Sequence, residues 1–346
     1  MHYKCNIEDL PRFFILGRPR SGTTMLRTML DAHPNIVVPP EFPVLSCVRK
    51  MTKEKWNEKE ISRFVAKASR CYKFSFIKIS AEELKHKLLA YYRSNGKMNL
   101  KLALIIMELS YSSPFPKDTL LMLGNKNPGY SMHVEKLRTL FPDACFIFLF
   151  RHILSVQEST QNVNFELRWP AFLAWRWKKS VQRAFAERSK HPEYSQIIRY
   201  EDLVANHEKV LKDICTFVGV PYSKSMLSFN DEAKLKDVFD DELYGVHSSL
   251  LLSPEDANLK NWSEKNYSRK QKISIAWAGN MLKMAGYEVS ETPGFWFYII
   301  GIPSVIIARS LLVIAMVLNK LSFGRFPRHI NAILAQIIYK NPNKNR

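Results

Sequence analysis

A glycine-rich turn near the start of the chain has the residue types that bind phosphate or sulfate groups. Residues 17–24 read GRPRSGTT, after a short apolar run at 13–17 and before apolar residues at helical spacing. In a strand, turn and helix of this kind, backbone N–H groups and the positive end of the helix dipole hold an anion. The alternative is an ordinary strand-to-helix turn. The candidate binding set is Arg20, Ser21, Gly22, Thr23 and Thr24.

Two positions in this turn discriminate between donors. Nucleoside triphosphate-binding loops carry a lysine after the second glycine, which reaches the β- and γ-phosphates, and this chain has Thr23 there. Arg20 adds a permanently charged guanidinium fork, which suits the oxygens of a donor without a γ-phosphate. By itself, Arg20 could equally form a surface ion pair. A P-loop phosphotransferase that uses ATP is the second functional hypothesis, and Thr23 disfavours it.

The elements that position this turn alternate between strands and helices. Apolar runs at 13–17, 145–150 and 197–198 predict strands, and helical patterns follow them, the last at about 207–218. Such alternation predicts an α/β fold, a P-loop-type parallel sheet flanked by helices. Residues 52–112 are mainly helical and charged in pattern, which predicts a helical insertion beside the sheet.

The string GRPRSGTT, followed by LRTMLDAHP, resembles the phosphosulfate loop of sulfotransferases that use 3′-phosphoadenosine 5′-phosphosulfate (PAPS). The chain is most similar to the protein-tyrosine sulfotransferases and their bacterial relatives, from Phe13 to about Tyr287. The resemblance implies a PAPS-dependent sulfotransferase domain over 1–290. It implies that PAPS donates a sulfonate group to a hydroxyl of a glycan, lipid or peptide by in-line displacement. No metal is expected, because this donor carries an activated leaving group and no metal-ligand cluster is evident.

The resemblance also implies the rest of the donor site. The segment FLFRHILSVQES supplies Arg151 and, eight residues later, Ser159, for the donor's 3′-phosphate. Tyr200, in RYEDL, matches a tyrosine near the nucleotide, with a core tyrosine as the alternative. The segment HSSLLLSPEDANLKNW resembles a loop that closes over the donor, with Ser248 or its neighbour Ser249 and Lys260 near the phosphates. For Lys260 an exposed polar loop is the competing interpretation, since Asn261 directly precedes the tryptophan.

On the acceptor side, the resemblance assigns catalytic roles to Glu41, Lys126 and Arg20. Glu41, in DAHPNIVVPPE, aligns with a catalytic glutamate and is the candidate general base, with an exposed loop carboxylate as the alternative. Lys126, in GNKNP, matches a lysine that stabilises the bridging oxygen as the bond breaks, or is a solvated turn lysine. Pro43 stands where the relatives carry an acceptor-binding arginine, so substrate choice is expected to differ.

Composition limits the partners and the compartment. The 51 Lys and Arg exceed the 32 Asp and Glu by 19, which favours anionic nucleotides or an acidic membrane surface. The chain has no zinc-finger spacing, RNA-binding aromatic signature or basic heptad region, so nucleic acid is not expected. Its five cysteines are scattered without a CxxC pair, which disfavours a disulfide framework and favours a reducing compartment. The N-terminus has no secretory signal, so a cytoplasmic location is predicted.

Residues 291–346 are predicted to form a membrane-associating extension. Residues 295–318 are apolar over 24 positions, interrupted by Arg309, and basic residues and a helical apolar stripe follow, up to 338. This length could span a bilayer, re-enter it or lie on its surface, and the predicted state is peripheral or monotopic. A buried helix or a dimer interface is the alternative. A basic membrane-binding module without enzymatic activity is the third functional hypothesis.

Overall fold

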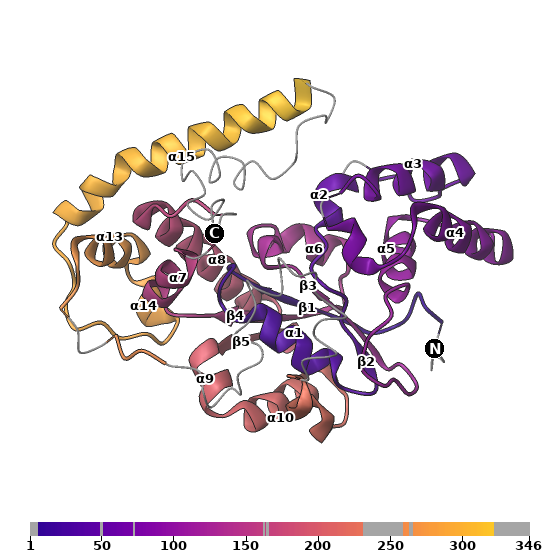
Figure 1. The fold of residues 1–346 in the computed structure, drawn as a ribbon, viewed down its shortest axis with the longest axis horizontal. Helices are drawn as coiled ribbons and strands as arrows, with labels where there is room; N and C mark the ends of the chain where they lie inside the picture. Colours follow the sequence, from indigo (N-terminus) through magenta and orange to yellow (C-terminus); the bar gives the residue numbers. More distant parts are fainter. Residues whose placement is uncertain are drawn as a thin grey trace, which may run out of the picture.

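Five parallel strands form the centre of the molecule (Figure 1). The computed structural model describes residues 6–48, 51–71, 73–161, 163, 166–230, 259–262 and 266–321. The strand order is β2-β3-β1-β4-β5, and all the pairs are parallel. The strands are β1 (Arg12–Gly17), β2 (Ile36–Val37), β3 (Met122–Lys126), β4 (Cys145–Phe150) and β5 (Ser195–Arg199).

Helices cover both faces of this sheet. Alternate side chains of β1 enter two separate cores: Phe14 and Leu16 lie in one, Phe13 and Ile15 in the other. This explains why the strand reads as a continuous apolar run, since a parallel sheet covered on both faces has no solvated side. The helices on the Phe13 face are α1 (Thr23–Asp31), α9 (Tyr200–Ala205) and α10 (His207–Val218).

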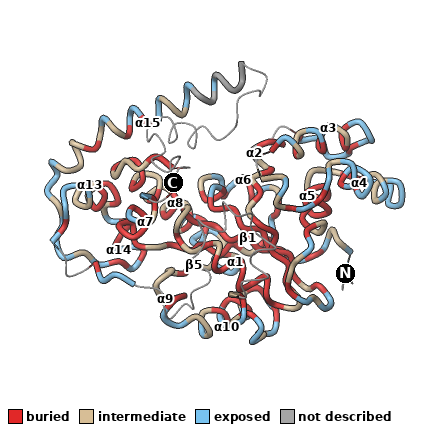
Figure 2. The backbone as a smooth tube through the Cα atoms, viewed as in Figure 1, coloured by how far each residue is buried: buried red, intermediate tan, exposed pale blue. Residues whose placement is uncertain are grey.

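The opposite face carries a larger layer of helices, and Figure 2 shows that the buried residues concentrate between it and the sheet. Its long central helix, α8, begins at Pro170, where proline's missing N–H costs nothing. The helices of this layer are α6 (Val134–Leu140), α7 (Ile153–Thr160), α8 (Pro170–Lys190), α13 (Arg269–Ala278), α14 (Met281–Met284) and α15 (Trp296–Leu321). Short 3₁₀ turns are η1 (Phe74–Ile77), η2 (Pro128–Met132), η3 (Pro192–Tyr194) and η4 (Lys224–Ser228).

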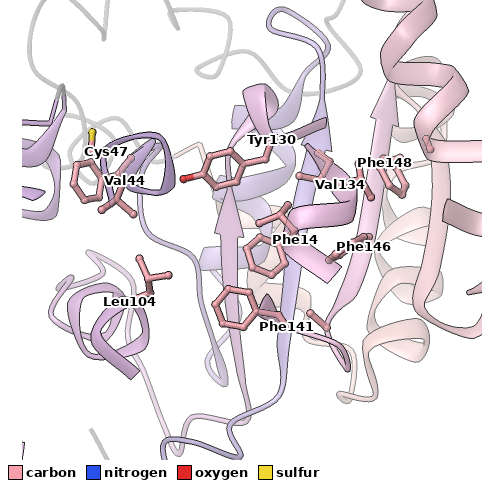
Figure 3. Close-up of a cluster of buried hydrophobic side chains, with 14 of the residues drawn as sticks. Phe14, Val44, Cys47, Leu104, Tyr130, Val134, Phe141, Phe146 and Phe148 are labelled. Carbon is pink, nitrogen blue, oxygen red and sulfur yellow. The ribbon is translucent and has the colours of Figure 1, made fainter. Parts of the chain in front are cut away.

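The predicted helical insertion gathers at one end of the sheet (Figure 1). It consists of α3 (Glu58–Ala68), α4 (Ala81–Asn95) and α5 (Leu100–Leu109), and the short helix α2 (Val44–Val48) precedes it. Figure 3 shows how its core joins the sheet: Leu104 of α5 and Val44 of α2 face the cluster that contains Phe14 and Tyr130. The Tyr130 hydroxyl accepts a hydrogen bond from the Leu45 N–H, 3.1 Å away, which fixes α2 beside the sheet.

The structure confirms the predicted fold class and adds two strands that the sequence pattern did not indicate. The predicted strands correspond to β1, β4 and β5, and the helix predicted at about 207–218 is α10. Strand β2 has two residues and β3 reads MLGNK, so neither presents an apolar run. The division into a domain over 1–290 and an extension over 291–346 stays a prediction.

The expectation of unpaired cysteines is wrong for one pair. Cys47 of α2 and Cys71 after α3 form a disulfide, with their Cα atoms 6.4 Å apart. The two lie 24 positions apart in sequence, and the packing of α2 against α3 brings them together. The cysteine pattern therefore no longer favours a reducing compartment, and the cytoplasmic location stays a prediction.

Candidate functional site

The candidate residues from four strands meet at one edge of the sheet. Because the strands are parallel, their carboxyl ends lie together, as in other open α/β sheets that bind ligands there. The glycine-rich turn follows β1, Arg151 follows β4, and Tyr200 follows β5. Lys126 ends β3 and lies opposite Ile15 of β1 in register. The tertiary fold thus brings segments that are far apart in sequence to one place.

The glycine-rich turn has the backbone that an anion site needs. Arg20 and Gly22 both have positive φ, 69° and 84°, and a left-handed conformation at a non-glycine residue is strained. Gly22 caps α1 without a side chain, and a Cβ there would lie 2.2 Å from the Tyr200 ring. The Ser21 hydroxyl is buried and has no hydrogen-bond partner in the described part of the chain. Buried polar groups are normally bonded, so this hydroxyl is available to donate to a bound anion.

Arg20, Arg151, Ser159 and Tyr200 contact one another around this turn. Arg20 Nε donates to Ser159 Oγ at 2.9 Å, and Arg151 Nη1 donates to the Arg20 carbonyl at 3.3 Å. The Arg151 guanidinium lies over the Tyr200 ring, 4.5 Å from its centroid. Burial and the nearby Arg151 charge lower the pKa of Arg20, which indicates two cations held close together. The positive potential of this pair favours a multiply charged anion.

A buried cluster of charged residues connects the glycine-rich turn to α8. Arg18 donates to Glu166 at 2.9 Å, and Glu166 also binds Arg176 of α8. Burial, followed by the Arg176 charge, lowers the pKa of Arg18 to about 10. Arg18 therefore fixes the position of the turn through its ion pair with Glu166.

Lys260 lies beside the same helix as Ser159. Its ammonium binds Glu158 at 2.7 Å, and Trp262, two residues on, donates from Nε1 to Ser155 Oγ at 2.8 Å. These contacts place this segment along α7. Ser248 lies outside the described residues, and so does the rest of its loop up to residue 258. The donor-binding roles of both residues stay predictions.

The acceptor-side candidates form a lysine–glutamate–lysine cluster. Lys126 Nζ lies 3.0 Å from Glu41 Oε2, and Lys73 Nζ lies 3.2 Å from Glu41 Oε1. The Lys126 side chain is 5% exposed and the Glu41 side chain 28%, so the carboxylate side chain is partly accessible to solvent and the lysine is not. Glu41 is therefore not an exposed loop carboxylate, and it is paired with Lys126. Lys126 is buried and is therefore not a solvated turn lysine.

Lys73 was not identified from the sequence. It belongs to no motif, stands 32 positions from Glu41 and lies in the helical insertion, to which no function was assigned. Lys73 adopts φ 68° at the start of η1, and the Phe74 ring packs against Phe42, with centroids 5.9 Å apart. The nearby Cys47–Cys71 disulfide ties the same two segments together. A pattern within one segment could not have revealed this cation.

The two lysines determine the protonation of the cluster. Burial by itself raises the pKa of Glu41, but the charges of Lys126 and Lys73 outweigh it and lower the pKa to about 2. Burial lowers the pKa of Lys126 to about 8, although Glu41 counteracts this shift. At neutral pH the carboxylate is ionised and Lys126 is mostly protonated.

A known family model covers more than half of the chain. The model described as the sulfotransferase family matches residues 11–224, which include the glycine-rich turn, Glu41, Lys126, Arg151, Ser159 and Tyr200. The chain belongs to the sulfotransferase family. This finding agrees with the resemblance inferred from the loop motif.

The individual relatives are also sulfotransferases, and their sequence identity to this chain is low. The chain is 23% identical over 226 residues to protein-tyrosine sulfotransferase 1 of Danio rerio, covering 64% of this chain and 56% of that protein. It is 25% identical over 231 residues to the protein-tyrosine sulfotransferase of Drosophila melanogaster, covering 64% and 40%. The chain thus spans about half the length of these relatives. The sulfotransferase domain of the Synechococcus PCC 7002 olefin synthase shares the fold, with a TM-score of 0.53, 21% identity and coverage of 84% of this chain and 99% of that domain.

Proposed function

We propose that this protein is an enzyme that transfers a sulfonate group from PAPS to a hydroxyl of a glycan, lipid or peptide. The observation that carries the proposal is the convergence of two chemically different groups of residues at one sheet edge. Arg20, Arg151 and Ser159 surround a phosphate-type turn, and Lys126 on the strand beside β1 holds Glu41. The first group suits an anionic donor, and the second suits proton removal next to a cation.

The residues around the turn fit this donor. The buried Ser21 hydroxyl and the N–H groups at the start of α1 would hold the 5′-phosphosulfate end. Arg151 and Ser159 would hold the 3′-phosphate. When bound, PAPS supplies a sulfuryl group that is already activated by its phosphate leaving group. We propose no metal for this chemistry.

The acceptor-side residues take the remaining roles. Glu41 takes the proton of the acceptor hydroxyl, because it is an ionised carboxylate that is partly accessible to solvent and lies beside Lys126. Lys126 stabilises the negative charge that develops on the bridging oxygen, and Arg20 stabilises charge on the sulfonate oxygens. Lys73 keeps Glu41 ionised until the acceptor binds. We further propose that the acceptor meets the enzyme at a membrane surface.

Removing Arg151 should weaken binding of 3′,5′-adenosine bisphosphate (PAP), the product nucleotide, about 10- to 100-fold, because a charged hydrogen bond contributes roughly 1.5–3 kcal/mol. Titration calorimetry of the full chain with PAP, without Mg²⁺, measures this change for Arg151→Ala and Ser159→Ala. Affinity for 5′-AMP, which lacks the 3′-phosphate, should change less than threefold in both variants.

The same titrations discriminate between the functional hypotheses. Tight binding of PAP without Mg²⁺ supports the proposal, whereas a preference for Mg-ATP supports a phosphotransferase. Binding of vesicles without measurable nucleotide affinity supports a membrane-binding module. For the acceptor, radiolabelled PAPS incubated with total lipid, glycan and protein extracts identifies the class that the wild type labels.

The transfer rate should fall as the pH rises through about 8, since Lys126 must be protonated and its pKa is about 8. The transfer rate should not decrease on the acid side of the pH profile until below about pH 4, because Glu41 has a pKa of about 2 and stays ionised above that pH. Lys73→Met removes one of the two cations on Glu41, raises the pKa of this carboxylate and moves the acid limb up. Lys73→Arg keeps the cation and should retain the wild-type profile.

The measurement is the initial rate of sulfonate transfer as a function of pH, at subsaturating PAPS. The acceptor is the extract fraction that the wild type labels. A profile of Lys73→Met that superimposes on that of Lys73→Arg would contradict the role given to Lys73. A loss of rate in both variants by the same factor at every pH would indicate a structural effect instead.

A further inference from the structure

The helix α15 rests with one face on the protein. Its first half contacts α8 and α13, and in Figure 1 the helix begins on the outside of this helical layer and extends beyond it. Val305 and Ala308 on its inner face are buried, and the Arg309 guanidinium lies over the Trp175 ring of α8 at 5.2 Å. The helix is therefore part of the folded unit.

The best-defined contact is between the start of α15 and Trp277 of α13. Trp277 Nε1 donates to the Tyr298 carbonyl at 3.0 Å, and the two rings stack with centroids 4.3 Å apart. A Cβ at Gly301 would lie 2.1 Å from the same Nε1 atom, so only glycine permits this approach. A helix that crossed a bilayer on its own would have to abandon these contacts.

The outer face of α15 and the residue before it carry large apolar side chains that are exposed. Seven of them are between 49% and 74% exposed, and the five from Ile306 on recur at helical spacing. Figure 2 shows the exposed residues of α15 alternating with less exposed ones along the helix. The set is Phe295, Trp296, Ile306, Ile307, Val313, Ile314 and Val317. So large an exposed apolar surface is typical of an interaction site.

Cations lie near the start of this surface, and the sequence beyond its other end is basic. The Lys272 ammonium is 5.9 Å from the centroid of the Phe297 ring, which places the start of α13 beside the start of α15, and it pairs with Glu291 at 2.6 Å. Arg269 and Lys270 in the same turn of α13 are exposed. At the other end the sequence continues with Lys320, Arg325 and Arg328. An apolar stripe with flanking cations, and with tryptophan and phenylalanine at one end, matches the headgroup and acyl regions of an anionic bilayer.

We infer that α15 lies lengthwise on an anionic membrane surface, with its outer face in the lipid and its inner face on α8 and α13. Among the described residues this is the one helix long and apolar enough to cross a membrane, yet its fixed inner face favours a position in the plane of the interface. The inference extends the proposed membrane encounter and does not depend on the transfer chemistry.

Vesicle flotation of the full chain tests this inference. The vesicles contain phosphatidylcholine, either alone or with about 30 mol% phosphatidylserine. The double variant Ile307→Glu/Val313→Glu should bind the anionic vesicles at least about tenfold less than the wild type. Met284→Glu, at an exposed apolar position on α14, should change binding less than twofold. Equal thermal unfolding and equal PAP affinity of the variants establish that the fold is intact.

Further measurements discriminate between a helix on the membrane surface, a helix that spans the membrane and a second copy of the chain bound to this face. Wild-type binding should weaken when NaCl rises from about 0.1 to about 0.5 M, and alkaline carbonate should release the bound protein. Retention after carbonate would overturn the inference in favour of a spanning helix. Equal flotation of the double variant and the wild type would also overturn it. A wild-type dimer that the double variant converts to monomer, without vesicle binding by either, would identify a second copy of the chain as the occupant.

Discussion

Replacing Lys126 with methionine is expected to slow sulfonate transfer about 10²- to 10³-fold, the loss typical when one preorganised charge donor is removed from an active site. The Lys126 ammonium is almost fully buried and lies on the strand next to β1, which leads into the glycine-rich turn. In such surroundings its attraction for a developing negative charge is weakly screened. Methionine has a similar length and leaves Glu41 paired with Lys73, so the fold should tolerate it.

The measurement is the initial rate at saturating radiolabelled PAPS with the extract fraction that the wild type labels. PAP affinity should stay within about threefold, because the lysine acts on the charge that forms during transfer. Lys136→Met, on the exposed surface of α6 ten residues later, is the matched control and should have the wild-type rate. If Lys126→Met keeps more than a fifth of the wild-type rate, the bridging oxygen is stabilised by another group.

Replacing Glu41 with glutamine should lower the transfer rate about 10²- to 10⁴-fold, the usual contribution of a general base. Glutamine has nearly the same shape and keeps one oxygen that accepts from Lys126, but it cannot take the proton of the acceptor hydroxyl. Both carboxylate oxygens are bound to lysines in this structure. The acceptor hydroxyl must therefore displace Lys73 from one of them before proton transfer.

Two measurements discriminate between loss of the base and loss of structure. PAP affinity of Glu41→Gln should match that of the wild type, and Glu41→Asp should recover part of the rate, since a shortened carboxylate still accepts a proton. Glu135→Gln, at an exposed position on α6, is the control. A Glu41→Gln variant with more than a tenth of the wild-type rate would show that the base lies elsewhere.

The pair of lysines on Glu41 also bears on acceptor choice. In the proposed reaction Glu41 loses its charge when it takes a proton, so Lys73 loses its anionic partner. The helical insertion supplies this second cation, and we expect it to influence which acceptor binds.

The sequence determined the phosphate-type turn and the fold class because both depend on local signals. Apolar runs, helical spacing and the string GRPRSGTT lie within short segments, and the residue type at Thr23 by itself disfavours a triphosphate-binding loop. Strand β3 escaped detection because its residues Gly124, Asn125 and Lys126 are polar or small, although all are buried in the sheet. Its strand conformation comes from pairing with β1 and β2, which no local pattern records.

Only the tertiary structure revealed Lys73, the Cys47–Cys71 pair and the one-sided packing of α15. Each depends on contacts between segments that are distant in sequence, and such contacts form because burial of apolar surface favours one compact arrangement of helices around the sheet. The apolar segment from residue 295 was visible in the sequence. Its packing against the protein depends on Trp277 and Gly301 meeting, which the linear pattern does not specify.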